Sequence, residues 1–330
     1  MSSWTRALAG LGLTGVMLAG PAAAQSPPSP LTIGLSSSST VAAAPRVAQE
    51  LGLFERRGLA PKFVVLENTS AATAALISKS VDVALVGSAD LIAAQARGQQ
   101  VVLLAPAYAG FGGSLVLAKA VADKLGVMPN APARERLKAL DGVLIGTASP
   151  TSPYTVALRG AAQAAGATPR FAYVSVPGMA AALESGAIQG FIASASFWVP
   201  AVLKGSAVLW VDGPKGDLPA ENTPRLSLGA AALRDYTQAH AAEVQQLRAV
   251  LADLARAIAE RPAEVKAAAA RLYPGLDAQL LDRMLTAEMP AWRGRSLTAK
   301  DMAHEIEFVK STGAPIPGLD KLDPAALLAP

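Results

Sequence analysis

Two stretches of the chain share one pattern of apolar and polar positions. Residues 74–88 read AALISKSVDVALVGS, residues 181–195 read AALESGAIQGFIASA, and the two align without a gap. Each predicts the end of an amphipathic helix, a tight polar turn, a short apolar strand, and small hydroxyl or glycine residues after it. Residues 33–36 and 145–148 form a second repeat, since both end a strand before a Ser/Thr-rich loop and an Ala-rich helix. The repeats predict two similar α/β units that present strand ends and helix N-termini to a shared cleft.

Strands and helices alternate along both units. In the first unit, strands are expected at 31–35, 62–66, 81–86, 100–106 and 115–118, and helices at 45–54, 70–80 and 89–97. Residues 119–141 predict a surface excursion, because two prolines and an asparagine break any long helix there. In the second unit, strands are expected at 143–146, 171–176, 188–193 and 208–211, and helices at 153–165, at 179–185 and from Phe197 onward.

The pattern from Ala231 onward is helical. One apolar stripe at spacings of three and four predicts a long helix that packs on the first unit; its residues are Val244, Leu247, Leu251, Leu254 and Ile258. A free coiled coil needs more heptads than this stripe provides. Shorter helices are expected at 263–272, 278–288 and 298–311. Together the elements predict an α/β fold with two doubly wound lobes and a helical C-terminal region. Residues 31–117 with 225–330 are expected in lobe 1, and residues 118–224 in lobe 2.

The N-terminus has the three parts of a secretory signal peptide. Arg6 precedes an apolar stretch at 7–20, and small residues follow up to Ala24. The apolar stretch is too short and too rich in glycine to span a bilayer. We therefore expect residues 1–24 to be a signal peptide cleaved after Ala24, residues 25–30 to be a Ser/Pro linker, and the mature protein to be free and soluble in an exported compartment. With no cysteine in the chain, a lipid-anchored lipoprotein is excluded.

Composition narrows the class of protein further. Removing 24 residues from 330 leaves 306, enough for about two domains. Without cysteine, neither disulfides nor thiolate metal sites are available. Arg6 is the one charge in the signal region, so the net charge falls from +4 to +3, which does not indicate a nucleic-acid partner. We expect a monomer.

The candidate ligand-binding residues follow the predicted strand ends and begin the predicted helices. Helix N-termini offer free N–H groups and a partial positive charge, which suit an anionic or strongly polar ligand. The alternative for each serine is helix capping, which contributes about 1 kcal/mol and requires no ligand. The candidates are Ser37, Ser38, Ser39, Thr40, Gly87, Ser88, Tyr108, Ser114, Thr151, Ser152, Tyr154, Ser196 and Trp198.

Several of the scarce aromatic residues also fall in these loops. Aromatic residues make up 5% of the chain, and their rings can line a pocket around an apolar or planar ligand. Tyr154 and Trp198 are the better candidates for pocket walls, whereas Phe111 and Phe197 suit core positions equally well.

Residues for catalysis are few. Both histidines, His240 and His304, lie in the C-terminal helices, far in sequence from every predicted cleft loop. The sequence has no Gly-rich phosphate loop, zinc spacing or nucleophile elbow, and Asp90 is the only acid close to a cleft loop. We therefore expect a binding site with no enzymatic activity, no metal and no cofactor.

Two motifs carry a resemblance to a known family. Gly52-Leu-Phe-Glu-Arg-Arg-Gly58 precedes a strand, and Val-Asp-Val-Ala-Leu-Val-Gly-Ser follows at 81–88. With these motifs the mature chain resembles the periplasmic substrate-binding proteins of the sulfonate, nitrate, taurine and thiamine-precursor group, which serve ABC importers. The resemblance implies a two-lobed type II fold, a hinge of two crossover strands, and closure over one small molecule. By position it implies ligand contacts from residues 37–40, 87–88, 114 and 151–152 and from the segment after Ile192.

One departure from the family pattern bears on the ligand. Relatives often have an aspartate where this chain has Gln189, and a Trp-acid-Pro motif where residues 196–198 carry no acid. This difference favours an anionic or neutral ligand over an ammonium group.

The leading hypothesis is a binder that delivers a small organic anion, such as an alkyl or aryl sulfonate, to an ABC permease. A neutral pyrimidine or thiamine-precursor ligand is an alternative. A pyrimidine-precursor synthase of the same fold is a further one, but such enzymes need an active-site lysine and histidine and stay in the cytosol. The fold also suits the effector domain of a regulator, although no DNA-binding segment precedes the first lobe.

Overall fold

The structure is a computed structural model that describes Met1, residues 28–293 and residues 295–330. Apart from Met1, the predicted signal peptide lies outside the described residues, as do residues 25–27 of the predicted linker. The end of that linker, Ser29 and Pro30, belongs to the first strand. Within the described part of the chain, no helix is both long enough and apolar enough to cross a membrane.

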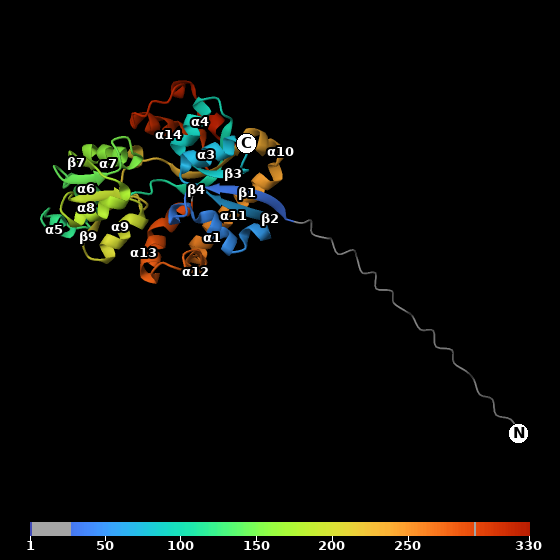
Figure 1. Cartoon of the computed structure of the whole chain (residues 1–330), viewed down its shortest axis with the longest axis horizontal. Coiled ribbons are helices and arrows are strands. Elements are labelled where there is room, and N and C mark those ends of the chain that lie inside the picture. The colour runs from blue at the N-terminus through green and yellow to red at the C-terminus, as the bar shows by residue number, and fades with distance from the viewer. Residues whose placement is uncertain (2–27, 294) are drawn as a thin grey trace.

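The strands of the described residues form two five-stranded mixed sheets (Figure 1). The first sheet contains β1 (Ser29–Leu35), β2 (Leu59–Val65), β3 (Val83–Gly87), β4 (Val101–Ala109) and β10 (Leu226–Leu233). The second contains β5 (Ser114–Ala118), β6 (Leu144–Thr147), β7 (Arg170–Tyr173), β8 (Gly190–Ala193) and β9 (Ala207–Asp212). Their orders, β2-β1-β3-β10-β4 and β7-β6-β8-β5-β9, are equivalent. The equivalence confirms the duplication predicted from the repeats.

Each sheet contains one strand that the chain reaches by crossing over from the other sheet. β5 runs antiparallel to β8 and β9 in the second sheet, and β10 runs antiparallel to β3 and β4 in the first. The predicted boundary after residue 117 places most of β5 in lobe 1. Its pairing instead places it in the second sheet, where Leu115 and Leu117 join the core. The crossing therefore lies before Ser114.

Helices cover both sheets. Around the first sheet lie η1 (Thr40–Ala42), α1 (Ala44–Glu50), α2 (Leu53–Arg56), α3 (Thr69–Ile77) and α4 (Ser88–Ala96). Around the second lie α5 (Lys119–Ala122), α6 (Ala133–Lys138), α7 (Pro153–Ala164), η2 (Val176–Gly178), α8 (Met179–Glu184) and α9 (Ala195–Leu203). The single helix predicted at 45–54 is in fact α1 and α2. Gly52 separates them, because its φ of 67° is left-handed and interrupts the helix.

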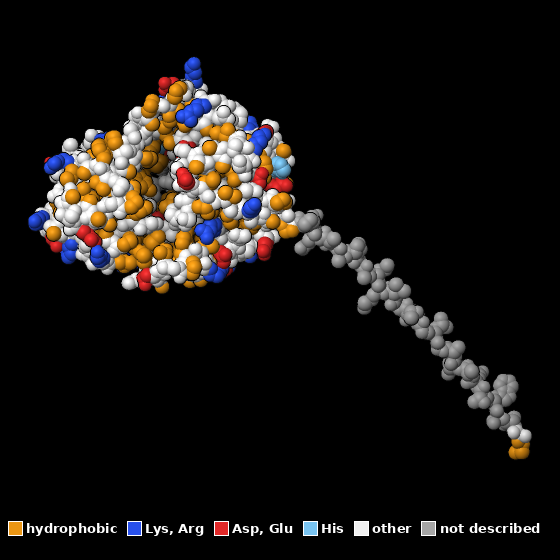
Figure 2. Space-filling model, in the orientation of Figure 1, with side chains coloured by type: hydrophobic (Ala, Val, Ile, Leu, Met, Phe, Trp, Pro, Cys, Tyr) orange, Lys and Arg blue, Asp and Glu red, His pale blue; other side chains and the backbone are white. Residues whose placement is uncertain are grey.

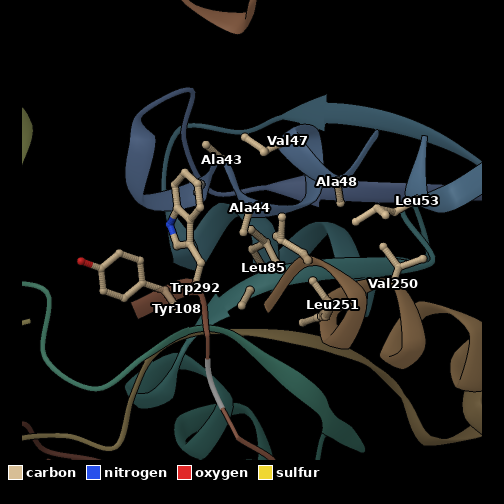
Figure 3. Close-up of a cluster of buried hydrophobic side chains, with 14 of the residues drawn as sticks. Ala43, Ala44, Val47, Ala48, Leu53, Leu85, Tyr108, Val250, Leu251 and Trp292 are labelled. Carbon is tan, nitrogen blue, oxygen red and sulfur yellow. The ribbon is translucent and has the colours of Figure 1, made fainter. Parts of the chain in front are cut away.

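The rest of the chain is mainly helical. Before β10 comes η3 (Ala220–Asn222), and after it come α10 (Arg234–Ala239), α11 (Ala241–Glu260), α12 (Pro262–Leu272), α13 (Ala278–Glu288), η4 (Met289–Trp292), α14 (Ala299–Ser311), η5 (Leu319–Lys321) and η6 (Pro324–Leu327). The apolar stripe of α11 lies in the core of the first lobe, as predicted. Figure 3 shows Val250 and Leu251 of α11 in the same cluster as Ala44 and Val47 of α1.

Helix α13 packs against both lobes. Leu281 and Leu285 belong to the core of the first lobe, whereas Met284 belongs to a cluster of the second lobe that includes Trp198. In Figure 1, α13 accordingly lies between α12 and α9. The C-terminal region therefore extends beyond the first lobe and reaches the junction between the lobes.

Candidate functional site

A cavity of about 460 Å³ lies between the two lobes. The first lobe contributes the start of α4, the second lobe the start of α7, and the beginning of β10 and the end of α14 complete the walls. Figure 2 shows the surface hollowed between the lobes, with hydrophobic side chains around the opening. The lining residues are Val41, Thr69, Gly87, Ser88, Ala89, Asp90, Ser152, Pro153, Tyr154, Pro224, Leu226, Ser227, Leu228, Phe308, Val309 and Thr312. The volume falls within the range of small-molecule pockets.

The helix starts at this cavity are not capped by their own hydroxyl groups. Gly87 precedes α4, and Ser152 precedes α7 without accepting a hydrogen bond from its backbone. Pro153 suits the first turn of α7, because its fixed φ fits the helix and its missing N–H is not needed there. Asp90 already lies in the first turn of α4, where it accepts a hydrogen bond of 2.7 Å from the Ser70 hydroxyl. The start of α7 thus has fewer side-chain partners within the protein than the start of α4.

A second contact between the lobes lies outside the cavity lining. The hydroxyl groups of Thr40 in η1 and Ser196 in α9 are 3.4 Å apart. On the first-lobe side, the hydroxyls of Ser37 and Ser39 bond to each other at 2.8 Å. The hydroxyl of Tyr273 donates to the carbonyl of Ser38 at 3.1 Å. The hydroxyl-rich loop of the first lobe therefore faces the start of α9 in the second lobe.

Glu288, at the end of α13, meets that same helix start. Its Oε1 accepts a hydrogen bond of 3.2 Å from the backbone N–H of Ala195, the first residue of α9. The side chain is 1% exposed, and burial raises the pKa of Glu288 to about 7, although the Tyr108 hydroxyl and the Ala195 N–H oppose the rise. The expectation that Asp90 is the only acid near the cleft is therefore wrong. A signal was present, because Glu288 continues the apolar stripe of Leu281 and Leu285.

Several buried polar side-chain atoms of the described residues make no hydrogen bond of ordinary geometry, and among them are Tyr108 Oη, Ser114 Oγ, Thr147 Oγ1, Glu288 Oε2 and Trp292 Nε1. The Tyr108 hydroxyl nevertheless lies close enough to Glu288 to lower the pKa of that carboxyl group. In Figure 3, Tyr108 and Trp292 lie side by side at one end of the apolar cluster, with the hydroxyl and the indole nitrogen directed away from it. Unsatisfied buried groups of this kind call for an explanation such as a bound ligand or water.

Burial and, to a smaller extent, the charge of Glu288 affect the pKa of two tyrosine hydroxyls. Burial, followed by the charge of Glu288, raises the pKa of Tyr108 well above its usual value. The same two causes raise the pKa of Tyr154, which lines the cavity. Tyr154 packs edge to face with Phe111, with the ring centroids 5.1 Å apart. Both tyrosine hydroxyls therefore stay protonated at neutral pH.

A second buried acid meets the hinge. Glu305 of α14 accepts a hydrogen bond from the backbone N–H of Arg225, immediately before β10. Burial raises the pKa of Glu305 to about 7, against the effects of the Arg225 N–H and the Ser88 hydroxyl. Ser88 and Ala195 occupy equivalent positions in the repeat. Each of these two helix starts is thus met by a buried glutamate from the C-terminal helices.

The model of one protein family matches residues 24–273, most of the chain, and its description is the NMT1-like family. The chain belongs to the NMT1-like family. A search of curated proteins found no match. The family match ends before α13, so Glu288 and Glu305 both lie beyond it.

Solved structures agree with this family in fold. The periplasmic aliphatic sulphonate binding protein SsuA from Escherichia coli has a TM-score of 0.66 at 18% identity, over 89% of this chain and 97% of that one. The alkanesulfonate-binding protein SsuA from Xanthomonas axonopodis pv. citri bound to MOPS has a TM-score of 0.60 at 18% identity, over 90% and 98%. The periplasmic nitrate-binding protein NrtA from Synechocystis PCC 6803 has a TM-score of 0.57 at 14% identity, over 89% and 86%. This NMT1-like chain therefore has the periplasmic binding protein fold, which confirms the resemblance seen in its sequence.

The sequence-predicted site residues of this NMT1-like protein fall into several groups. Gly87, Ser88, Ser152 and Tyr154 line the cavity together. Residues 37–40 and Ser196 lie at the second contact between the lobes. The side chains of Tyr108 and Ser114 are buried without partners, and Thr151 is exposed beside the start of α7. Trp198 does not line the cavity, because it packs in the second-lobe cluster with Met284 of α13.

Proposed function

We propose that this protein is a periplasmic solute-binding protein of an ABC importer, which captures a small organic molecule between its lobes and passes it to a permease. The observation that carries the proposal is the interlobe cavity, which combines the start of a helix from each lobe with the hinge strand β10. Ligands of open α/β sheets bind outside the carboxyl ends of the strands, where this cavity lies. The proposal includes export with removal of residues 1–24 and function as a monomer.

The proposed ligand is a small organic anion, such as a sulfonate or carboxylate. The support is the uncapped start of α7, where backbone N–H groups and the Ser152 hydroxyl are available to an anionic group. Among the described residues, Asp90 is the only charged one that lines the cavity, and it already offsets the positive end of α4. We therefore place the anionic group nearer α7, with its organic part against Tyr154 and Phe308.

A neutral pyrimidine is the second candidate ligand. The observation that favours it is Glu288, a buried carboxyl group that accepts from the N–H of Ala195 at the start of α9 and lies beside the Tyr108 hydroxyl. A ring with amino and ring-nitrogen groups suits such a mixture of hydrogen-bond acceptors and donors.

We propose binding without conversion. His304 Nε2 lies 2.8 Å from the carbonyl oxygen of Thr223, and His240 stacks on Tyr236 with the ring centroids 4.4 Å apart. Neither histidine lines the cavity between the lobes. The synthase alternative needs a histidine in the site, so this arrangement supports a binder over that enzyme.

Native mass spectrometry of protein purified gently from the periplasm tests the proposal. A retained small molecule, released on unfolding, is the expected result. Thermal-shift measurements with sulfonates, carboxylates and pyrimidines then rank the ligand classes, since a ligand at 100 times its dissociation constant stabilises by about 2.7 kcal/mol. No retained mass and no shift with any of the three classes would contradict the proposed function.

A further inference from the structure

Helix α13 has two apolar stripes that pack on different lobes. Leu281 and Leu285, four residues apart, belong to the core of the first lobe. Leu280, Met284 and Ala287, at spacings of four and three, pack in the second-lobe cluster instead. Residues three and four apart share one face of a helix, so each lobe meets its own face of α13. The helix therefore joins the lobes at a place separate from the crossing segments.

The polar contacts of α13 attach it to the first lobe. Lys266 of α12 donates a hydrogen bond of 2.6 Å to Oδ1 of Asp282 and one of 2.8 Å to the Thr286 hydroxyl. Helix α12 in turn belongs to the first lobe, where Val265 lies in the core. Both these bonds and the stripe in the first-lobe core hold α13 to that lobe. We therefore expect α13 to move with the first lobe.

The contact of α13 with the second lobe is smaller. Met284 is 5% exposed and is the buried member of its stripe, whereas Leu280 and Ala287 are half-buried. One hydrogen bond accompanies this stripe, from the N–H of Ala195 to Oε1 of Glu288 at 3.2 Å. Packed lobes separate where the fewest contacts are lost. If the lobes part on this side, the contact between α13 and α9 is the one that breaks.

The lobes of this structure are in contact beside the cavity. Phe308 of α14 lines the cavity and also belongs to a core cluster of the second lobe. The cavity takes its walls from both lobes, so this arrangement is the one that encloses a molecule. Met284 does not line the cavity. Its influence on capture therefore acts through the way in which the lobes are held together.

We propose that Met284 is a positioning residue that latches the two lobes in the enclosing arrangement. Release of a captured molecule requires the lobes to part, which takes Met284 out of the second-lobe cluster. Apparent affinity falls with the fraction of protein in the enclosing arrangement, so a weaker latch lowers the affinity. The role in capture rests on the proposed function, whereas the latch is a property of the protein without any ligand.

Distances between spin labels test the latch on the mature protein without ligand. The chain has no cysteine, so Val65→Cys and Tyr173→Cys introduce two unique labelling sites. Each of these side chains is 54% exposed, and each ends the equivalent edge strand of its sheet, one in each lobe. Double electron–electron resonance then measures the separation of the lobes. The labelled protein with native Met284 is expected to show mainly one short distance.

Met284→Ala in the labelled protein is expected to raise the ratio of long to short distances about tenfold or more, because the substitution removes most of the buried contact. Met284→Leu keeps a similar apolar volume and is expected to retain the short distance. Val250→Ala is the matched control, since Val250 is fully buried in the first-lobe core on α11. This control is expected to lower stability and to leave the distances unchanged.

Two results would overturn the inference. One is a distance distribution that Met284→Ala leaves as it is, and the other is an equal change in Val250→Ala. Leu280→Ala removes less from the same stripe and decides the question if Met284→Ala does not fold. A shift of Leu280→Ala toward longer distances supports the latch, and unchanged distances overturn it.

The outcomes separate this inference from the proposed function. The distances need no ligand, so the latch is tested even if the protein retains no small molecule. If the latch fails while a molecule is retained on purification, capture stands and other contacts hold the lobes. If the latch is supported and no compound binds, the capture function fails and the latch remains.

Discussion

Two buried glutamates, Glu288 and Glu305, meet the two helix starts that the repeat relates to each other. Both carboxyl groups have a pKa of about 7, and burial is the main cause in each. The ordinary value is 4.5, so the folded protein favours the protonated acid. The resulting stability is fully present below pH 4.5 and is lost as the pH rises through 7. The side chains that face Glu288 are mainly tyrosines, which stay neutral in this window.

The wild-type protein is therefore expected to unfold more easily at pH 8 than at pH 5. A rise in pKa from 4.5 to about 7 corresponds to about 3 kcal/mol for Glu288. Urea unfolding at the two pH values measures this difference, and Glu288→Gln is expected to reduce it by that amount while the Glu305 contribution remains. The exposed Asp282→Asn serves as control. An unchanged pH dependence in Glu288→Gln would show that Glu288 does not titrate in this range.

Helix α14 shows how one local motif supports the hinge. Its N-cap is Thr298, whose hydroxyl accepts from the N–H of Asp301 at 3.3 Å, while Asp301 accepts from the N–H of Thr298 at 2.8 Å. Arg295 donates to both carboxylate oxygens of Asp301, and this pairing lowers the pKa of Asp301 below its ordinary value. The capping box therefore orders the start of the helix that places Glu305 against the hinge.

Removal of this cap is expected to destabilise the protein. Thr298→Ala leaves an N–H of α14 without its acceptor and should lower the free energy of unfolding by about 1 kcal/mol. Urea denaturation measures the loss. Thr298→Ser keeps the hydroxyl group and is expected to stay near the wild-type value. Equal losses in the two variants would mean that the hydroxyl does not act as a cap.

The two lobes are held together at their crossing segments and by the C-terminal helices. Where the crossing segments meet, Gly213 packs directly on Gly113, and an added Cβ would overlap the carbonyl oxygen of Gly113 and lie 2.6 Å from Phe111 Cδ1. No side chain fits at this position without moving one segment. The close approach of the two glycines thus sets the spacing of the hinge.

Gly213→Ala is expected to push the crossing segments apart. The variant should unfold at least about 2 kcal/mol more easily, because the overlap is with backbone and cannot relax through a rotamer change. Small-angle X-ray scattering is expected to show a larger radius of gyration than that of the wild-type protein. Gly275→Ala, where nothing lies within 4 Å of an added Cβ, is the control. Unchanged scattering and stability would contradict this account of the hinge.

The amino-acid sequence was sufficient to predict the repeated α/β units, most of their strands and helices, and four of the sixteen residues that line the cavity. Residues 74–88 and 181–195 take the same structure in both lobes, and Gly87, Ser88, Ser152 and Tyr154 line one cavity. These features depend on apolar periodicity and turn residues within short stretches of the chain, so local sequence patterns are enough to predict them.

Other features depend on contacts between distant parts of the chain. The apolar sequence of β5 suits either sheet, and its pairing with β8 and β9 assigns it to the second. Glu288 contacts Ala195, which lies 93 positions earlier in the chain. Trp198 does not line the cleft, because it packs in one apolar cluster with Met284 of α13. Such contacts form only when the C-terminal helices close over the junction of the lobes. The burial that these contacts produce raises the pKa of Glu288 and so changes the chemistry between the lobes. No local pattern in the sequence predicts this change.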